Sequence, residues 1–174
     1  MINKGEEQRA HLIMKLRGQG IRSASVLSAI ESVPRDIFIE NALKNHAWEN
    51  VTLPIGEGQT ISQPYIVALM TTALNLSGKE IVLEIGTGSG YQASILSLLC
   101  RRVYTIERIK TLHEFSNQKF KELKLNNITT KFGNGSLGWP EVSPFDRIIL
   151  TCAINPVSYT HLRAHETKAN LVCR

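Results

Sequence analysis

The chain has 174 residues, of which 43% are hydrophobic and 20% charged, and its formal net charge is +5. This composition is typical of a globular protein with enough chain for one buried core. Lysine and arginine are scattered without an aromatic–basic stripe, which argues against a nucleic-acid partner. The three cysteines, Cys100, Cys152 and Cys173, have no CxxC spacing, which argues against a disulfide framework or a zinc site.

The N-terminal sequence has no apolar run of signal-peptide length, and no window of the chain is apolar over the length of a membrane span. We therefore expect a cytoplasmic protein without a membrane partner. No cluster of histidine, cysteine or carboxylate residues has metal-ligand spacing, so no metal is expected.

Residues 1–79 are predicted to form a helical N-terminal region. Residues 5–18 place Leu12, Ile13 and Leu16 on one face of an amphipathic helix. Further helices are expected at 23–31, starting near Ser23 or Ser25, and at 65–76, with a turn and a short helical or extended piece at 33–39. The stretch IGEGQTISQP (55–64) has almost nothing to bury and is predicted to be a surface loop.

From residue 80 the hydrophobic period changes. Short apolar runs bounded by turn residues alternate with helical patterns, which predicts right-handed strand–helix–strand units and a parallel sheet. The predicted strands are 80–85, 102–107, 128–132 and 145–153, and the predicted helices are 91–100 and 111–125. This α/β region, 80–156, is the predicted core domain.

The segment 157–174 breaks the pattern, because a helix and further strands should follow the fourth strand. Its sequence VSYTHLRAHET, then LVCR, resembles a translated sequencing-library adapter fused to a truncated gene. A native disordered tail is the alternative. If the segment is foreign, the last strands of the sheet are missing and strand 145–153 becomes an exposed edge that invites aggregation.

A glycine-rich turn follows the first predicted strand of the core. In VLEIGTGSGY (82–91), Gly86, Gly88 and Gly90 allow a sharp turn and close approach of the backbone to a ligand. The helix that begins near Tyr91 presents free N–H groups to the same space. A dinucleotide fingerprint needs a third glycine at position 91, where this chain has tyrosine.

Two acids accompany this turn. Glu107 ends the second strand, 21 residues beyond Gly86, where an acid can accept hydrogen bonds from both hydroxyls of a ribose. Glu84 lies inside an apolar strand, where a carboxylate is costly unless it has a hydrogen-bonding role near the site. Together these residues resemble the class I S-adenosylmethionine (AdoMet) methyltransferases, which have a Rossmann-like parallel sheet flanked by helices.

The resemblance implies AdoMet as the cofactor, with its amino-acid end at the glycine turn and its ribose on Glu107. Adenine is expected near GNGS (133–136), where family members usually have an aspartate and this chain has Asn134. A neutral amide there should weaken cofactor binding by about 1 kcal/mol. The implied cofactor-binding residues are Glu84, Gly86, Thr87, Gly88, Gly90, Glu107, Asn134 and Gly135.

Five stretches occur in an order that resembles the protein-L-isoaspartate O-methyltransferase family. They are VPRDIFI, IGEGQTISQP, VLEIGTGSGYQAS, GNGSLGWP and PFDRIIL, within residues 5–156, and the GQTIS loop is the most specific. The resemblance implies methylation of the free carboxylate of L-isoaspartyl and D-aspartyl residues in damaged proteins and peptides. By the same resemblance Ser62 is the active-site serine, and Gln59, Thr60 and Ile61 cover the substrate.

Another AdoMet methyltransferase, acting on a small molecule or on RNA, is the alternative in chemistry. An inactive truncated fragment is the alternative without catalysis. An acceptor carboxylate is already ionised at neutral pH, so the absence of a general base agrees with the leading hypothesis. A plain turn before the helix at 65–76 is the competing interpretation of the 55–64 loop.

Overall fold

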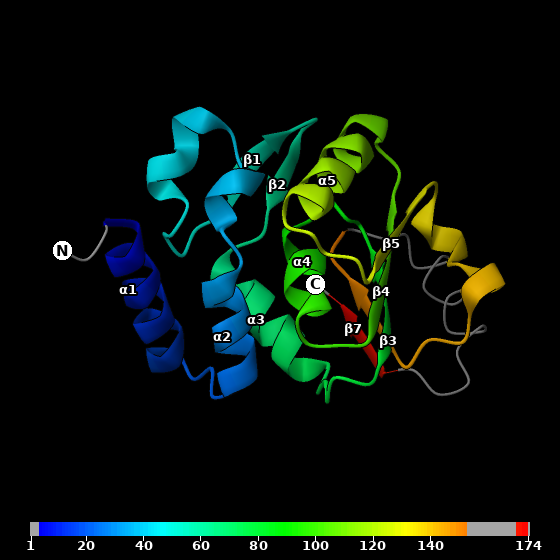
Figure 1. The fold of residues 1–174 in the computed structure, drawn as a ribbon, viewed down its shortest axis with the longest axis horizontal. Coiled ribbons are helices and arrows are strands. Elements are labelled where there is room, and N and C mark those ends of the chain that lie inside the picture. Colours follow the sequence, from blue (N-terminus) through cyan, green and yellow to red (C-terminus); the bar gives the residue numbers. More distant parts are fainter. Residues whose placement is uncertain (1–3, 153–169, 174) are drawn as a thin grey trace.

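The computed structural model describes residues 4–152 and 170–173. Helices and a small hairpin formed by the first part of the chain pack beside a parallel sheet formed by the second part (Figure 1). This arrangement confirms the predicted Rossmann-like α/β fold with an N-terminal helical extension. Among the described residues, no helix combines the length and apolar character needed to cross a membrane.

The N-terminal region begins with two helices that follow the predicted pattern. Ser23 caps the second helix, because its side chain accepts a hydrogen bond from the backbone N–H of Val26. Two short 3-10 helices follow. The buried apolar side chains of the two α-helices and of the first 3-10 helix share one core, and the partly buried Leu43 of the second 3-10 helix packs against it. The elements are α1 (Lys4–Gly18), α2 (Ala24–Ser32), η1 (Arg35–Phe38) and η2 (Asn41–His46).

The stretch 55–64, predicted to be a surface loop, contains most of a β-hairpin. Strand β1 (Leu53–Gly56) pairs antiparallel with β2 (Gln59–Ile61), and Glu57 at the turn has a φ of 54°. Only the two end residues, Leu53 and Ile61, are buried, so the alternation typical of a strand is too weak to read from the sequence. The hairpin leads into α3 (Pro64–Ala73), which starts with proline in its first turn.

Within residues 4–152 and 170–173, the sheet has five parallel strands in the order β5-β4-β3-β6-β7. The predicted strands correspond to β3 (Ile81–Ile85), β4 (Arg102–Glu107), β5 (Ile128–Phe132) and β6 (Arg147–Leu150). The expectation that β6 is an exposed edge is wrong, because β7 (Asn170–Cys173) pairs with it in parallel. Residues 157–169 lie outside the described part of the chain, and the foreign origin of 157–174 stays a prediction.

Helices cover one face of this sheet. The helices α3, α4 (Tyr91–Ser97) and α5 (Lys110–Glu122) lie on the side that faces the N-terminal region (Figure 1). A buried apolar cluster joins these helices to the alternate residues of three strands, for example Val82, Val103 and Ile149. This face therefore has the predicted strand–helix–strand architecture.

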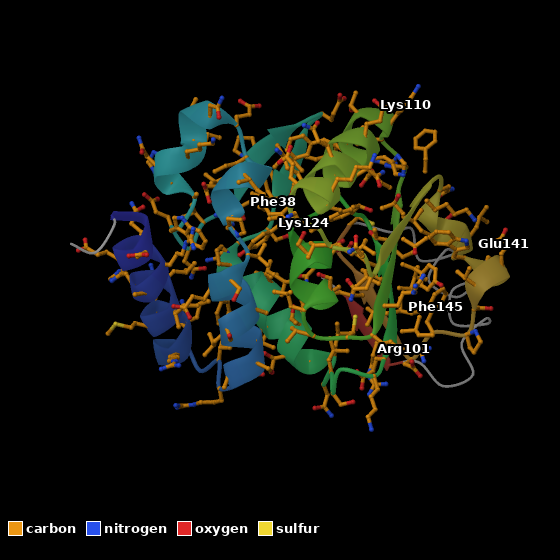
Figure 2. The ribbon with its side chains drawn as sticks, viewed as in Figure 1. Phe38, Arg101, Lys110, Lys124, Glu141 and Phe145 are labelled. Atoms are coloured by element: carbon orange, nitrogen blue, oxygen red, sulfur yellow. The ribbon has the colours of Figure 1, made fainter. Side chains whose placement is uncertain are left out.

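The opposite face is covered by the segment 133–146, which forms two short 3-10 helices, η3 (Gly135–Leu137) and η4 (Pro140–Val142). Trp139 and Phe145 from this segment both pack edge-on against Tyr104 of β4. Figure 2 shows Phe145 on the side of the sheet away from Phe38, which lies in the N-terminal core. Asp146 accepts a hydrogen bond from the backbone N–H of Ile81, which joins the starts of β6 and β3.

Glu84 occupies the middle of β3 and is fully buried. The hydroxyl of Thr105 on β4 donates a hydrogen bond of 2.5 Å to one carboxyl oxygen. The other oxygen, Oε1, has no hydrogen-bond partner in the described part of the chain. Burial raises the pKa of Glu84 to about 8; the hydrogen bond from Thr105 opposes this shift and the charge of Glu107 adds to it. The acid is therefore neutral in the folded core near pH 7.

The raised pKa predicts a pH-dependent stability. Glu84 binds its proton more tightly in the folded than in the unfolded chain. Its stabilising contribution is therefore complete below about pH 4 and is lost as the pH rises to about 8. Glu84→Gln mimics the protonated acid. We expect it to remove this loss and to raise the unfolding free energy at pH 8 by roughly 4 kcal/mol.

Thermal or urea unfolding across pH 5–8 measures this effect. Glu114→Gln, at a side chain exposed on α5, is the matched control and should leave the pH profile unchanged. Parallel profiles for the wild-type chain and Glu84→Gln would show that Glu84 does not titrate in the folded state as described.

Candidate functional site

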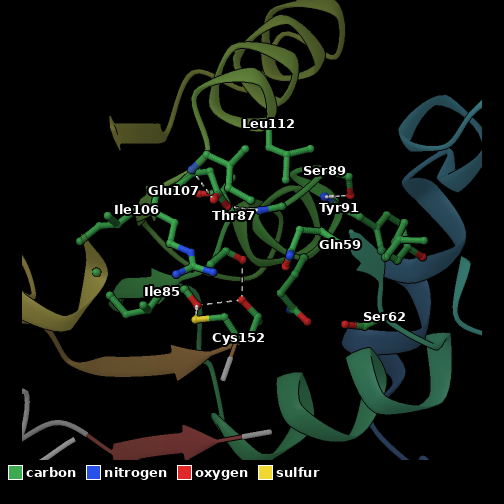
Figure 3. A pocket seen from close by; sticks show the side chains of 18 of the residues that line it. Gln59, Ser62, Ile85, Thr87, Ser89, Tyr91, Ile106, Glu107, Leu112 and Cys152 are labelled. Atoms are coloured by element: carbon green, nitrogen blue, oxygen red, sulfur yellow. Dashed lines mark hydrogen bonds between the residues drawn. The ribbon is translucent and has the colours of Figure 1, made fainter. Parts of the chain in front are cut away.

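A cavity of about 710 Å³ lies at the carboxyl ends of β3, β4 and β6. Its volume is in the range of pockets that hold cofactors and small molecules. Most of the wall is formed by five segments, and Figure 3 shows many of the lining side chains. The main lining segments are 59–62, 85–89, 106–109, 134–136 and 151–152. Open parallel sheets bind ligands at this edge.

The glycine turn after β3 forms one wall. Gly86 has a φ of 98°, and a Cβ at this position would stand 2.9 Å from the Cβ of Cys152. Thr151 donates hydrogen bonds to the carbonyl oxygens of Ile85 and Gly86, which fixes the start of the turn. Only glycine fits this combination of backbone angle and close contact. Gly86, Thr87 and Gly88 all line the cavity, as predicted.

Gly90 has a different position in the structure. It precedes the first residue of α4 with a φ of 92°, and a Cβ there would collide with the ring of Phe120. Gly90 is not among the residues that line the cavity, and neither is Glu84, which is enclosed in the core. Cofactor contact by these two predicted residues therefore has no support from the cavity's geometry.

Glu107, at the end of β4, lines the cavity beside the glycine turn. Its Oε2 accepts a hydrogen bond of 2.8 Å from the backbone N–H of Gly88, and its Oε1 accepts one of 2.9 Å from Ile109. Only 5% of the residue is exposed. A carboxylate oxygen can accept more than one hydrogen bond, so Glu107 can still receive two hydroxyl donors from a ligand. These contacts fix the carboxylate in place before a ligand binds.

A chain of hydroxyl groups connects the cavity to Glu84. Thr87 lines the cavity, and its hydroxyl lies 2.6 Å from that of Thr105, which in turn donates to Glu84. The buried acid therefore supports the glycine turn through two threonine side chains. This relation places Glu84 behind the cavity wall.

The 134–136 segment closes another side of the cavity. The side-chain oxygen of Asn134 accepts a hydrogen bond from the N–H of Ser136 and caps η3. A Cβ on Gly135 would overlap the side chain of Ile85. Asn134 and Gly135 both line the cavity, as the sequence predicts. The cap uses the side-chain oxygen of Asn134, so the side-chain nitrogen takes no part in it.

The β2 strand and the residue that follows it face these walls. Gln59, Thr60, Ile61 and Ser62 all line the cavity. In Figure 3, Ser62 lies across the cavity from Glu107, and its side chain is directed toward the interior. At the hairpin turn Glu57 accepts a hydrogen bond of 2.8 Å from the Thr111 hydroxyl on α5. The hairpin therefore links the cavity lining at 59–61 to α5, the helix that follows Glu107.

Several lining residues were not predicted from the sequence. Tyr91, Arg108, Ile109, Leu112 and Cys152 also line the cavity. A signal existed for Arg108 and Ile109, because they directly follow the acid at the end of β4. Tyr91, Leu112 and Cys152 match ordinary core positions of helices and strands, and nothing in the sequence separates them from core residues.

The lining residues contain neither a nucleophile–base pair nor a set of metal ligands. Among the described residues, no group of three or more His, Cys, Asp or Glu could hold a metal ion. The available groups are backbone N–H donors, hydroxyls, the Cys152 thiol, one carboxylate at Glu107, one guanidinium at Arg108, and the carboxamides of Gln59, Gln92 and Asn134. This set can bind and orient two polar ligands beside each other but has no residue placed for general-base catalysis.

Comparison with known proteins identifies the family. Residues 7–167 match the family model of protein-L-isoaspartate(D-aspartate) O-methyltransferase, so the match extends into the segment 157–174. A protein-L-isoaspartate O-methyltransferase of Parvibaculum lavamentivorans is 55% identical over 152 residues, which cover 87% of this chain and 68% of that protein.

Two solved structures have the same fold. A protein-L-isoaspartate O-methyltransferase superposes with a TM-score of 0.83 at 27% identity, covering 91% of this chain and 52% of the other, so this chain spans about half the length of that protein. A Plasmodium falciparum structure in complex with S-adenosyl-L-homocysteine has a TM-score of 0.72 at 22% identity, covering 92% of this chain and 80% of that chain. The chain belongs to the protein-L-isoaspartate(D-aspartate) O-methyltransferase family.

Proposed function

We propose that the protein transfers a methyl group from AdoMet to the free carboxylate of L-isoaspartyl and D-aspartyl residues in damaged proteins, which begins their repair. The observation that carries this proposal is the placement of Ser62 and Glu107 on opposite sides of one cavity. One side suits a ribose-bearing cofactor and the other suits a peptide carboxylate. The partners are then isoaspartyl-containing proteins and peptides. A cytoplasmic location stays a prediction.

The residues of the cavity fit AdoMet. The anchored Glu107 carboxylate can accept the ribose hydroxyls, and the glycine turn offers close backbone approach for the amino-acid end. Asn134 and Gly135, near which the family resemblance puts adenine, line the same cavity. When bound, AdoMet supplies a methyl group on a positively charged sulfur.

The acceptor needs no base from the protein. An aspartyl-type carboxyl has a pKa of about 4 and is already ionised at neutral pH. The loop at 59–62 can hold the carboxylate with hydroxyl and backbone groups while leaving its charge in place. Orientation of two reactants can supply roughly 7–11 kcal/mol of a barrier. In this proposal Ser62 hydrogen-bonds the substrate, and no covalent intermediate forms on it.

Glu107→Ala is expected to weaken cofactor binding. A hydrogen bond to a charged group contributes roughly 1.5–3 kcal/mol, so the Kd for S-adenosylhomocysteine should rise at least about tenfold. Isothermal titration calorimetry measures the Kd, and Glu114→Ala on the exposed face of α5 is the control. An unchanged Kd in Glu107→Ala would exclude the proposed ribose contact.

Ser62→Ala should leave the Kd for the cofactor within about twofold of the wild-type value and lower kcat for an isoaspartyl peptide by about tenfold. This is the effect of losing one hydrogen bond in the transition state. Calorimetry and a methyl-transfer assay with radiolabelled AdoMet measure the two quantities. Loss of cofactor binding with normal turnover at saturation would reverse the roles assigned to Ser62 and Glu107.

Asn134→Asp should tighten cofactor binding. Aspartate keeps the cap on the Ser136 N–H and offers a charged acceptor to an adenine amino group. We expect the Kd for S-adenosylhomocysteine to fall about fivefold, the equivalent of roughly 1 kcal/mol. Asn127→Asp, at a residue that bonds carbonyl groups near the other end of β4, is the control. A higher Kd in Asn134→Asp would contradict the proposed adenine contact.

A further inference from the structure

Arg35 in η1 is a fully buried cation. Its guanidinium donates to three carbonyl oxygens, those of Ala47 at 2.6 Å, Val51 at 2.9 Å and Ser62 at 3.1 Å. No carboxylate in the described part of the chain lies within ion-pair distance of it. The side chain therefore joins three separate segments through their backbone.

A buried charge needs compensation. The three hydrogen bonds from a charged donor and the nearby ring of Tyr91, 5.7 Å from the guanidinium carbon, offset the cost of removing Arg35 from water. Apolar residues often stabilise a core as well as buried charges do. A contribution to stability is therefore a weak explanation for an arginine at this position. The segments that Arg35 joins suggest a role in the site instead.

One of those segments is the substrate loop. Arg35 holds the carbonyl of Ser62, the residue that faces the cofactor side of the cavity. Asn50 holds the chain immediately after it, because its side chain accepts the N–H of Tyr65 and its carbonyl accepts the Gln63 amide. The loop is thus fixed firmly at the end that carries Ser62.

Arg35 also contacts Tyr91, on the side of the cavity where the cofactor is expected. Tyr91 is the first residue of α4, directly after the glycine turn, and it lines the cavity. Its ring also packs edge-on against Phe38. Arg35 therefore contacts a residue next to Gly90 and the backbone of Ser62 at the same time.

We propose that Arg35 is a positioning residue for methyl transfer: it fixes the backbone at Ser62 and ties the substrate loop to the start of α4. This inference rests on the function proposed above. A displacement of about 1 Å in a reacting group can reduce a rate by as much as 100-fold, so a loosened loop lowers turnover. Arg35 acts through Ser62 and does not contact the reacting atoms.

Arg35→Met and Arg35→Lys test the proposal. We expect kcat for an isoaspartyl peptide to fall roughly 10- to 100-fold in Arg35→Met and less in Arg35→Lys, which keeps the charge but not the fork of donors. The Kd for S-adenosylhomocysteine should change less than about threefold. An unchanged kcat, or equal losses of cofactor binding and kcat, would overturn the positioning role.

Arg147→Met is the matched control, because Arg147 also bonds two carbonyl oxygens, those of Leu74 and Asp146, but does not line the cavity. We expect it to lower the Tm while leaving kcat per folded molecule unchanged. A similar fall in kcat in this control would show that loss of any carbonyl-bridging arginine reduces activity.

A double-mutant cycle tests whether Arg35 acts through Ser62. If it does, Arg35→Met combined with Ser62→Ala should be about as active as Ser62→Ala alone. Additive losses in kcat would show that Arg35 acts at another point and would overturn the proposal. Should Arg35→Met fail to fold, Arg35→Lys takes its place in the cycle.

Hydrogen exchange supplies a measurement that does not depend on activity. Backbone amides of 59–63 should exchange faster in Arg35→Met or Arg35→Lys than in the wild-type chain, and at the wild-type rate in Arg147→Met. Unchanged exchange in the Arg35 variants would overturn the proposal. If the wild-type protein transfers no methyl group to an isoaspartyl peptide, the proposed function fails, and the exchange rates still decide whether Arg35 holds the loop.

Discussion

The hydrogen bond between the Glu107 carboxylate and the N–H of Gly88 holds the candidate site together. It links the turn after β3 to the end of β4, and the second carboxylate oxygen is held in turn by Ile109. Thr151 after β6 binds the same glycine turn from the other side. Three neighbouring strand ends are therefore joined by bonds to backbone groups, and the same carboxylate that joins them faces the cavity.

The sequence predicted the sheet well and the hairpin poorly. The bounds of β4 and β5 agree with the prediction, because buried parallel strands are short apolar runs between turn residues. Helix ends differ by a few residues, as at α4, which stops at Ser97. The alternation of buried and exposed residues in the hairpin was too weak to predict strands. Strand β7 was not predicted either, because the segment 157–174 does not continue the strand–helix pattern of the core.

Within the site, the sequence predicted those residues that belong to motifs with a characteristic spacing. It did not predict the residues whose role depends on contacts with distant parts of the chain. The glycine turn, Glu107 and the 59–62 loop all line the cavity. Arg35 lies in the stretch VPRDIFI, but its role was not predicted, because its partners are carbonyl groups 12, 16 and 27 positions away, and every residue has a carbonyl. Gly90 and Glu84 belong to the same motif, but they pack against Phe120 and Thr105 behind the wall.

The contact between Glu57 and Thr111 determines how firmly the hairpin turn is held to α5. It is one exposed hydrogen bond, and such a bond contributes about 1 kcal/mol, less than twice the thermal energy RT. Leu53 and Ile61 at the base of the hairpin are buried, so the base is held by core packing that does not involve this bond. The turn can therefore part from the helix on the fast timescale of surface loops without unfolding of the core.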